Sequence, residues 1–315
     1  MDAERVARCD PSLAARPTPG VRLGRWADKT FKYWALAPAL VLLFGFHLYP
    51  LLSLLRLAVS HVSFVGNHVT ITFAAMENLR TLANDWIAAA AIKNSLVFVS
   101  VAVSVEMVVG FALAILASGL GPGARHYRVV MMLPILVAPV AIGSMWRHLY
   151  NFDFGLVNRS MTLLHLPPQA WLGSIWLALP AVIAVDIWHW VPLVFLVCLA
   201  GLETLPGDIL EASRVDGASW WRMLRHIVLP LVWPALSVVL LLRIIGALRV
   251  FDEIVLLTSG GPGTATTVLS WYIYQVSFVE SRLGYGAMLS IVAILIALGF
   301  LAAYNRAKPS HAGAG

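Results

Sequence analysis

The sequence predicts an all-α, polytopic membrane protein with six transmembrane helices, and three observations lead to this fold class. Hydrophobic residues make up 60% of the 315 residues and charged residues only 12%, about half the charged share of a soluble globular protein. The mean hydropathy is +0.81. The apolar residues also gather in blocks of about 20, the length of a helix that crosses a hydrocarbon core about 30 Å thick.

Each expected span ends where the sequence changes character. The first follows an Arg-rich segment and lacks a convincing Ala-x-Ala cleavage site, so we expect an uncleaved span rather than a signal peptide. Glycine and proline in 119–123 predict a tight turn after the second span, and 204–208 interrupt the chain after the fourth. The expected spans cover about 34–57, 94–118, 128–149, 175–201, 229–250 and 285–304.

The distribution of Lys and Arg predicts how these spans are oriented. Most of the 22 Lys and Arg residues lie in segments that face the cytoplasm if both termini are cytoplasmic, as the positive-inside rule requires. Because these residues lie in short loops, the net charge of +6 does not indicate a nucleic-acid partner. We therefore expect a cytoplasmic N-terminal tail (1–32), a transmembrane domain in the lipid bilayer (33–306) and a cytoplasmic C-terminal tail (307–315).

A polar insert at 203–230 separates the fourth and fifth spans and would face the cytoplasm. Asp208 and Glu211 predict a helix start, because a carboxylate there accepts hydrogen bonds from free backbone N–H groups. Gly217 predicts the end of this helix, and a second short helix is expected over 220–228. Physical chemistry leaves two interpretations open, an amphipathic anchor in the headgroup region or a docking helix for a cytosolic partner.

Several polar side chains lie within or near the expected spans, where an ionisable group costs about 2.5–3.5 kcal/mol at mid-bilayer and must face protein or water. For Asn94, Ser95 and Glu106, hydrogen bonds between helices are the simplest role. Arg243 is expected either to reach toward the outer surface or to pair with an acid. The full set is Asn94, Ser95, Glu106, His148, Asp186, His189 and Arg243.

The sequence lacks the motifs of an enzyme or a metalloprotein. It has no Cys/His cluster, no His-Glu-x-x-His and no Gly-x-Ser-x-Gly. It also has no phosphate-binding loop and no Gly-Lys dipeptide, so ATP must bind elsewhere. We expect no catalytic residue, no metal site and no cofactor in this chain.

The stretch "EASRVDGASWWRMLRHIVLP" (211–230) resembles the cytoplasmic loop of the membrane components of binding-protein-dependent ABC importers. The family pattern is Glu-Ala-Ala, then Asp-Gly-Ala, then Ile-x-Leu-Pro, and Ser213 replaces the second alanine. The matching residues are Glu211, Ala212, Asp216, Gly217, Ala218, Ile227, Leu229 and Pro230. The carbohydrate branch, the maltose-permease-like proteins, is similar in four further segments, which are 77–98, 146–158, 186–206 and 251–278.

This resemblance runs from about 35 to 305 and implies the type I permease fold of ABC importers in the bacterial cytoplasmic (inner) membrane. Residues 208–217 would be the coupling helix, which fits a cleft on a cytosolic ATPase, with Glu211 and Gly217 central to the contact. The implied partners are a second homologous permease, two ATPase subunits that bind ATP and Mg, and an extracytoplasmic solute-binding protein.

The implied solute is a sugar or a related compound such as a polyol or glycerol phosphate. A sugar pathway combines neutral polar donors with aromatic rings that pack on the apolar face of the sugar, although aromatic residues near span ends also form the interfacial belt. The pathway candidates are Trp188, His189, Trp190, Phe251, Asp252 and Asn94. The alternative function is an ion-coupled secondary transporter without an ATPase, but such proteins usually contain internal repeats, which are not evident here.

Overall fold

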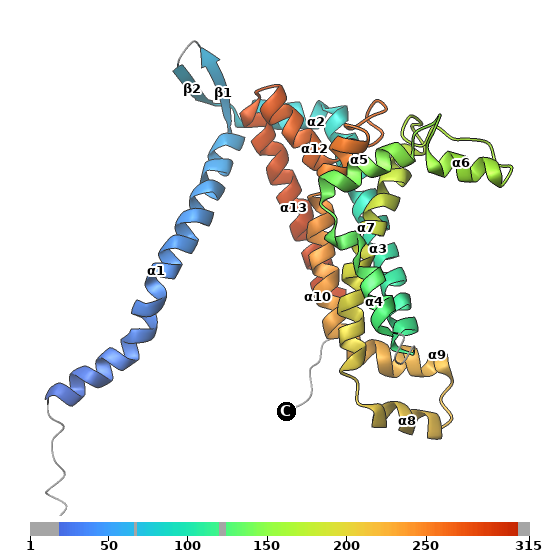
Figure 1. Ribbon diagram of the computed structural model, residues 1–315. Coiled ribbons are helices and arrows are strands. Elements are labelled where there is room, and N and C mark those ends of the chain that lie inside the picture. The colour runs from blue at the N-terminus through green and yellow to red at the C-terminus, as the bar shows by residue number, and fades with distance from the viewer. Residues whose placement is uncertain (1–18, 66–67, 120–123, 308–315) are drawn as a thin grey trace, which may run out of the picture. The chain divides into compact units, whose positions relative to one another are not determined.

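The computed structural model is largely helical (Figure 1). It falls into two units, Met1–Leu54 and Leu55–Gly315. The residues that the structure describes are 19–65, 68–119 and 124–307. Much of both predicted tails, and most of the predicted turn at 119–123, lie outside these ranges.

Helix α1 (Pro19–Ala58) accounts for the described part of the first unit. Its segment Ala35–Ala58 is apolar and long enough to cross a membrane, which agrees with the predicted first span at 34–57. The helix begins earlier than predicted, within the basic segment, because no proline interrupts residues 20–37.

In the second unit, helices α3 (Trp86–Ser118) and α7 (Ala178–Glu203) pack along each other. The two backbones approach closely at Gly110, where an added Cβ would lie only 2.7 Å from the Cβ of Val194. Helix α10 packs against both, and α13 packs against α10 (Figure 1). The remaining bounds are α10 (Leu229–Leu248) and α13 (Leu283–Ala307). These four helices enclose most of the apolar core.

Helices α3, α7 and α13 correspond to the second, fourth and sixth predicted spans, with shifted ends. The largest shift is at the start of α3, about two turns earlier than predicted. Asp85 caps this helix, because its carboxylate accepts hydrogen bonds from the backbone N–H groups of Ile87 at 2.9 Å and Ala88 at 3.1 Å. The polar Lys93 and Asn94 conceal these first turns from a hydropathy argument.

The third predicted span, 128–149, is not a single helix. It consists of α4 (Ala124–Met132), the short 3-10 turn η3 (Pro134–Leu136) and α5 (Pro139–Leu149). Proline cannot donate a backbone hydrogen bond and restricts the residue before it, so each of the two prolines starts a new piece. Of these pieces, α4 and η3 pack against α7, and α5 packs against α11 (Asp252–Leu257) (Figure 1). Five described helices are thus long and apolar enough to cross a membrane unbroken, and this broken segment takes the place of the third predicted span.

The predicted fifth span, 229–250, also begins earlier than expected. Helix α9 (Trp220–Met223) continues through a π-helical turn, η4 (Leu224–Val228), directly into α10. The wider turn lies just before Pro230, which has no N–H to donate within the helix. The prediction of a separate short helix is therefore wrong, and Trp220–Leu248 forms one helix of membrane length.

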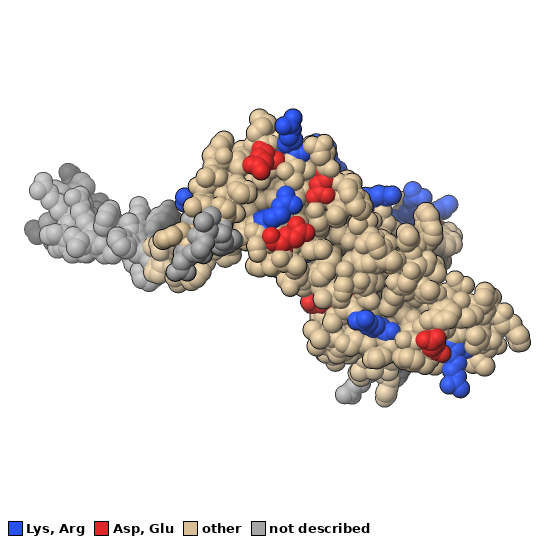
Figure 2. All heavy atoms as spheres, turned by 90° about the horizontal axis from the view of Figure 1, so that it is seen from above, with Lys and Arg blue, Asp and Glu red and all other residues tan. Residues whose placement is uncertain are grey.

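The two ends of the second unit carry different elements (Figure 1). One end, called the α8 end, carries α8 (Gly207–Val215) and α9. The other, called the α2 end, carries an antiparallel hairpin and several short helices: β1 (Ser60–Val65), β2 (His68–Phe73), α2 (Ala75–Asn84), α6 (Leu156–Leu163), α11 (Asp252–Leu257), α12 (Leu269–Tyr274) and the π-helical η5 (Gln275–Val279). Seen from the α2 end, charged side chains of both signs are scattered among uncharged ones (Figure 2).

Candidate functional site

The polar insert forms an exposed helix at the α8 end. Helix α8 begins at Gly207, directly after the extended Pro206, and Asp208 lies in its first turn. No side chain caps this helix start, so the predicted capping by Asp208 is wrong. Proline suits the position before a helix, because a backbone N–H there would have no acceptor within the helix and its absence costs no hydrogen bond.

Gly217 follows the end of α8, as predicted. Its φ is +73°, in the left-handed region that glycine adopts at little cost. The N–H of Gly217 donates to the carbonyl of Arg214 at 3.1 Å, and the N–H of Ala218 donates to that of Ser213 at 3.0 Å. A side chain at position 217 would meet no atom within 4 Å, so the backbone conformation, and not lack of space, calls for glycine.

Helix α8 presents most of its surface to the outside. Only Ser213 is buried, and its hydroxyl donates to the carbonyl of Leu210 at 2.8 Å. Ile209 is 41% exposed and Val215 87% exposed, and Ala212 between them is exposed as well. Spaced three residues apart, these side chains form one apolar face. Both predicted roles of the insert, a headgroup anchor and a docking helix, require such an exposed apolar face.

A buried cluster of ionisable side chains lies between α3, α7 and α10. Arg243 is 1% exposed, and its Nε and Nη2 donate to the carboxylate of Glu106 at 2.6 and 2.8 Å. Nη2 also donates to Asp186 at 2.8 Å, and the guanidinium lies 4.6 Å from the ring centre of Trp190. Of the two roles predicted for Arg243, pairing with an acid is therefore the one that occurs.

A second pair lies next to this cluster and adds helix α11. His189 Nδ1 lies 3.4 Å from Glu253 Oε1, and both side chains are buried. His189 is also about one turn from Asp186 on α7. We call Glu106, Asp186, His189, Arg243 and Glu253 the ionic cluster. No set of three His, Cys, Asp or Glu residues in the described ranges could hold a metal ion.

The predicted pathway residues of α7 lie at this cluster or beside it. His189 is a member of the cluster, and the ring of Trp190 contacts its Arg243. The rings of His189 and Trp190 lie 4.8 Å apart. Trp188 is 36% exposed and packs edge-on against Trp146 of α5 at 5.6 Å between ring centres. Polar donors and aromatic faces, the combination that sugar recognition requires, thus occur together on α7.

The other predicted pathway residues lie apart from the cluster. Phe251 packs in an aromatic group with Trp271 at 5.9 Å and Tyr274 at 5.3 Å, and Asp252 is exposed at the start of α11. Asn94 is hydrogen-bonded to the backbone before α12, since its amide donates to the carbonyls of Thr264 at 2.9 Å and Thr267 at 3.0 Å.

Ser95 joins α3 to the first residue of α12. Its hydroxyl accepts a hydrogen bond from the N–H of Leu269 at 2.7 Å. The predicted contact between helices is present for Ser95, through Leu269 of α12, and for Glu106, through its ion pair. For Asn94 the prediction is wrong, because its partners are backbone carbonyls of the segment before α12.

The family comparison decides what this fold is. Residues 35–307 match the family described as "binding-protein-dependent transport system inner membrane component". The chain belongs to this family. It is therefore a multi-pass membrane permease subunit of a binding-protein-dependent ABC importer, and the ion-coupled secondary transporter is not favoured.

Several named relatives resemble this permease over most of its length. The trehalose/maltose transport system permease protein MalF of Thermococcus litoralis is 36% identical over 66% of this chain and 70% of its own. The sulfoquinovosyl glycerol transport system permease protein SmoG of Agrobacterium fabrum is 30% identical over 97% of this chain and 98% of its own. The trehalose transport system permease protein SugA of Mycobacterium tuberculosis is 28% identical over 90% of this chain and 92% of its own.

A solved structure shares the permease fold. The chain in the crystal structure of a bacterial alginate ABC transporter, in complex with an alginate pentasaccharide-bound periplasmic protein, is 22% identical and superposes with a TM-score of 0.77. The match covers 93% of this permease and 99% of that chain. The predicted ABC importer permease fold is therefore confirmed.

Sequence reasoning missed two residues of the permease that the structure brings to the site. Glu253 stands in an expected outer loop directly beside Asp252, and the structure buries Glu253 while it leaves Asp252 exposed. Trp146 falls in the broken third span and packs against Trp188. A Glu followed directly by the apolar run Ile-Val-Leu-Leu is the one local sign that residue 253 is buried.

Proposed function

We propose that this permease forms the translocation pathway for a sugar or related solute, driven by ATP that is hydrolysed on separate cytosolic subunits. It would pair with a second homologous permease, two ATPase subunits and an extracytoplasmic solute-binding protein. In this proposal the α8 end faces the cytoplasm and the α2 end faces outward. ATP and Mg belong to the ATPase subunits.

The exposed α8 is the observation that carries this proposal. A short helix, fixed at its end by the left-handed Gly217, presents an apolar face of Ile209, Ala212 and Val215 to the outside. Glu211, also exposed, is placed to make a charge-assisted hydrogen bond with an Arg or Lys of the ATPase. Ala218 lies in the short connection from this helix to the continuous helix Trp220–Leu248, which contains Leu229 and Pro230, so that movement at the ATPase would tilt that span.

The solute class is supported by the relatives and by the surroundings of α7. The named relatives transport trehalose, maltose or sulfoquinovosyl glycerol. Trp188, His189 and Trp190 supply aromatic faces and polar donors of the kind that bind sugars. Arg243 is engaged by both Glu106 and Asp186, so its guanidinium is not free to attract an anionic solute into the bundle.

The coupling role is tested by Gly217→Val and Glu211→Lys in the reconstituted complex. We expect both variants to insert normally and to lose solute-stimulated ATPase activity, because valine disfavours φ of +73° by about 1–2 kcal/mol and lysine reverses the contact charge. Gly263→Val is the matched control, since Gly263 also has positive φ and open space around it but lies at the α2 end. Full stimulation in the two α8 variants would refute the coupling role.

A further inference from the structure

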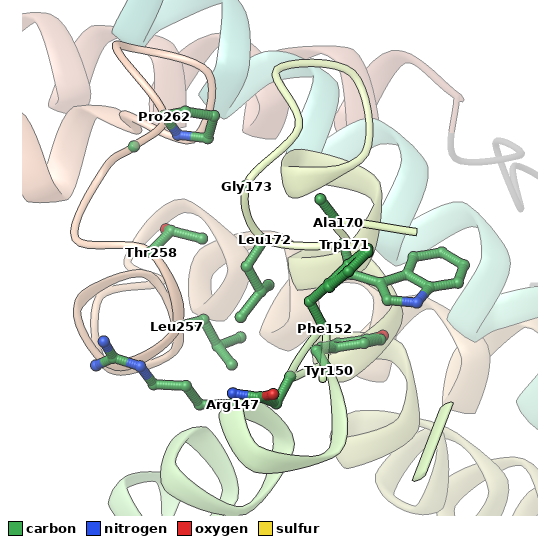
Figure 3. A pocket seen from close by; sticks show the side chains of 12 residues that line it. Arg147, Tyr150, Phe152, Ala170, Trp171, Leu172, Gly173, Leu257, Thr258 and Pro262 are labelled. Atoms are coloured by element: carbon green, nitrogen blue, oxygen red, sulfur yellow. The ribbon is translucent and has the colours of Figure 1, made fainter. Parts of the chain in front are cut away.

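A cavity of about 460 Å³ lies at the α2 end of the permease (Figure 3). Small-molecule sites in proteins typically measure about 300–1,000 Å³. Three segments form its walls: 147–152 at the end of α5, 170–173 before α7, and 257–262 after α11. None of these residues belongs to the ionic cluster or to α8, so the cavity is a separate feature of the fold.

One buried side chain fastens the first two walls together. Asn158 is 3% exposed, and its amide nitrogen donates to the carbonyls of Phe152 at 3.2 Å and Gln169 at 2.9 Å. Its amide oxygen accepts from the N–H of Gln169 at 3.0 Å and from Trp171 Nε1 at 2.9 Å. All four hydrogen bonds join segments of the cavity wall, which is therefore formed before any ligand arrives.

The third wall is fixed in a comparable way. The hydroxyl of Thr266 donates to the carbonyl of Gly261 at 2.7 Å, and that of Thr267 to the carbonyl of Gly260 at 2.9 Å. Both threonines are buried, and Asn94 of α3 holds the carbonyl of Thr267 as well. A pre-formed wall binds a ligand without the entropic cost of ordering a loop.

The lining of the cavity combines apolar surface with a hydrogen-bond donor. Leu172 and Leu257 extend into the space, with Arg147 at its edge (Figure 3). Phe152 lines the cavity and is 52% exposed. The guanidinium of Arg147 makes only a long contact of 3.4 Å to a backbone carbonyl, and no Asp or Glu lines the cavity. The N–H groups of Arg147 are therefore available to the oxygen atoms of a ligand.

We propose that this cavity binds a sugar ring at the outer surface of the permease, before the sugar reaches the spans. The apolar face of the ring packs on Phe152, and Arg147 donates to its hydroxyl or carboxylate oxygens. Leu257 in the cavity wall is about one helical turn from Glu253 of the ionic cluster on α11, so this site adjoins the proposed pathway. The inference rests on the proposed function for the outward orientation of the α2 end.

The test measures sugar binding to the purified permease complex in nanodiscs, with the solute-binding protein left out. The probes are maltose and trehalose as neutral sugars and glucuronate as an acidic one, each followed by equilibrium dialysis. For each sugar that binds to the wild-type complex, we expect Phe152→Ala to raise the dissociation constant by about fivefold or more. Arg147→Gln should weaken glucuronate binding more than maltose binding if the ligand is acidic, and both equally if it is neutral.

Phe154→Ala is the matched control, because Phe154 is 68% exposed, two residues away and outside the cavity lining. We expect it to bind as the wild-type complex does. Absence of sugar binding in the wild-type complex would overturn the proposal, and so would equal affinity in the Phe152, Arg147 and Phe154 variants.

A second measurement separates this site from its alternatives. If the cavity instead receives a loop of the solute-binding protein, Phe152→Ala weakens docking of the ligand-free binding protein and leaves sugar affinity unchanged, which overturns the proposal. Solute-stimulated ATPase activity of the wild-type complex is recorded in parallel, with the solute-binding protein and the solute that it binds added back. Its presence without sugar binding at the cavity rejects only this inference, whereas its absence rejects the proposed importer function.

Discussion

Replacing Arg243 with methionine tests whether the ionic cluster holds the helices of the permease together. Methionine has a comparable length and no charge, so the substitution removes three hydrogen bonds, two to Glu106 and one to Asp186. Both carboxylates are at most 1% exposed. They cannot regain the lost partner from water, so their unpaired charge is the main cost.

The expected size of the effect follows from this burial. Breaking a buried ion pair by removing one partner costs about 3–5 kcal/mol, whereas replacing all its members with uncharged side chains of similar volume is often close to neutral. We therefore expect Arg243→Met to lower the midpoint of thermal unfolding by about 6–20 °C, at about 2–4 °C per kcal/mol. The triple variant with Glu106→Gln and Asp186→Asn should recover most of this loss.

The assay is thermal unfolding of the detergent-purified permease complex, followed by fluorescence and by loss of the monodisperse peak. Arg249→Met is the control, because Arg249 follows the end of the same helix and is exposed. We expect its midpoint to stay within about 2 °C of the wild type. A midpoint of Arg243→Met equal to that of Arg249→Met would refute the reasoning, as would a triple variant less stable than the single one.

Two further predictions concern the ends and the centre of the bundle. Burial acts to raise the pKa of Asp85, but hydrogen bonds from two tyrosines and two backbone N–H groups outweigh it, and the pKa lies below its ordinary value. Because the pKa is lowered in the folded state, the ionised carboxylate stabilises the fold above about pH 4, and this stabilisation is lost as the pH falls further. The stability of the wild type should therefore decrease more steeply below about pH 4 than that of Asp85→Asn. Parallel profiles of thermal stability between about pH 3 and 7 would contradict this. Gly110→Val forces α3 and α7 apart, since its Cβ would lie 2.7 Å from that of Val194, and we expect little folded complex by size-exclusion chromatography. Gly299→Val, with open space around it, should fold normally, and equal yields of the two valine variants would count against the packing argument.

The sequence was sufficient for the fold class and for the element that identifies the family. Three features are local properties of the chain: the apolar blocks of membrane length, the Glu-Ala-Ser and Asp-Gly-Ala pattern, and the helix-ending role of Gly217. They depend on neighbouring residues, and the structure retains them. Trp188, His189 and Trp190 were selected in the same way, from their chemistry within one predicted span, and their role in a pathway stays a prediction.

Helix boundaries depended on features that hydropathy does not measure. Asp85 extends α3 beyond its apolar block by capping it, whereas two prolines divide the third span although its residues remain apolar. The turn before Pro230 joins two elements that were predicted to be separate. In each case a hydrogen bond of a backbone N–H group, made to a side chain or missing at proline, decided where the helix began.

Only the tertiary structure decided which polar residues face one another. Glu106 and Arg243 are 137 positions apart, and His189 and Glu253 are 64 apart, so no local pattern links them. The same holds for Asn158, whose fully satisfied amide reveals the cavity wall. A single sequence specifies how apolar each segment is, because that property adds up along the chain; it does not reveal which buried charges meet, because that depends on the packing of several helices at once.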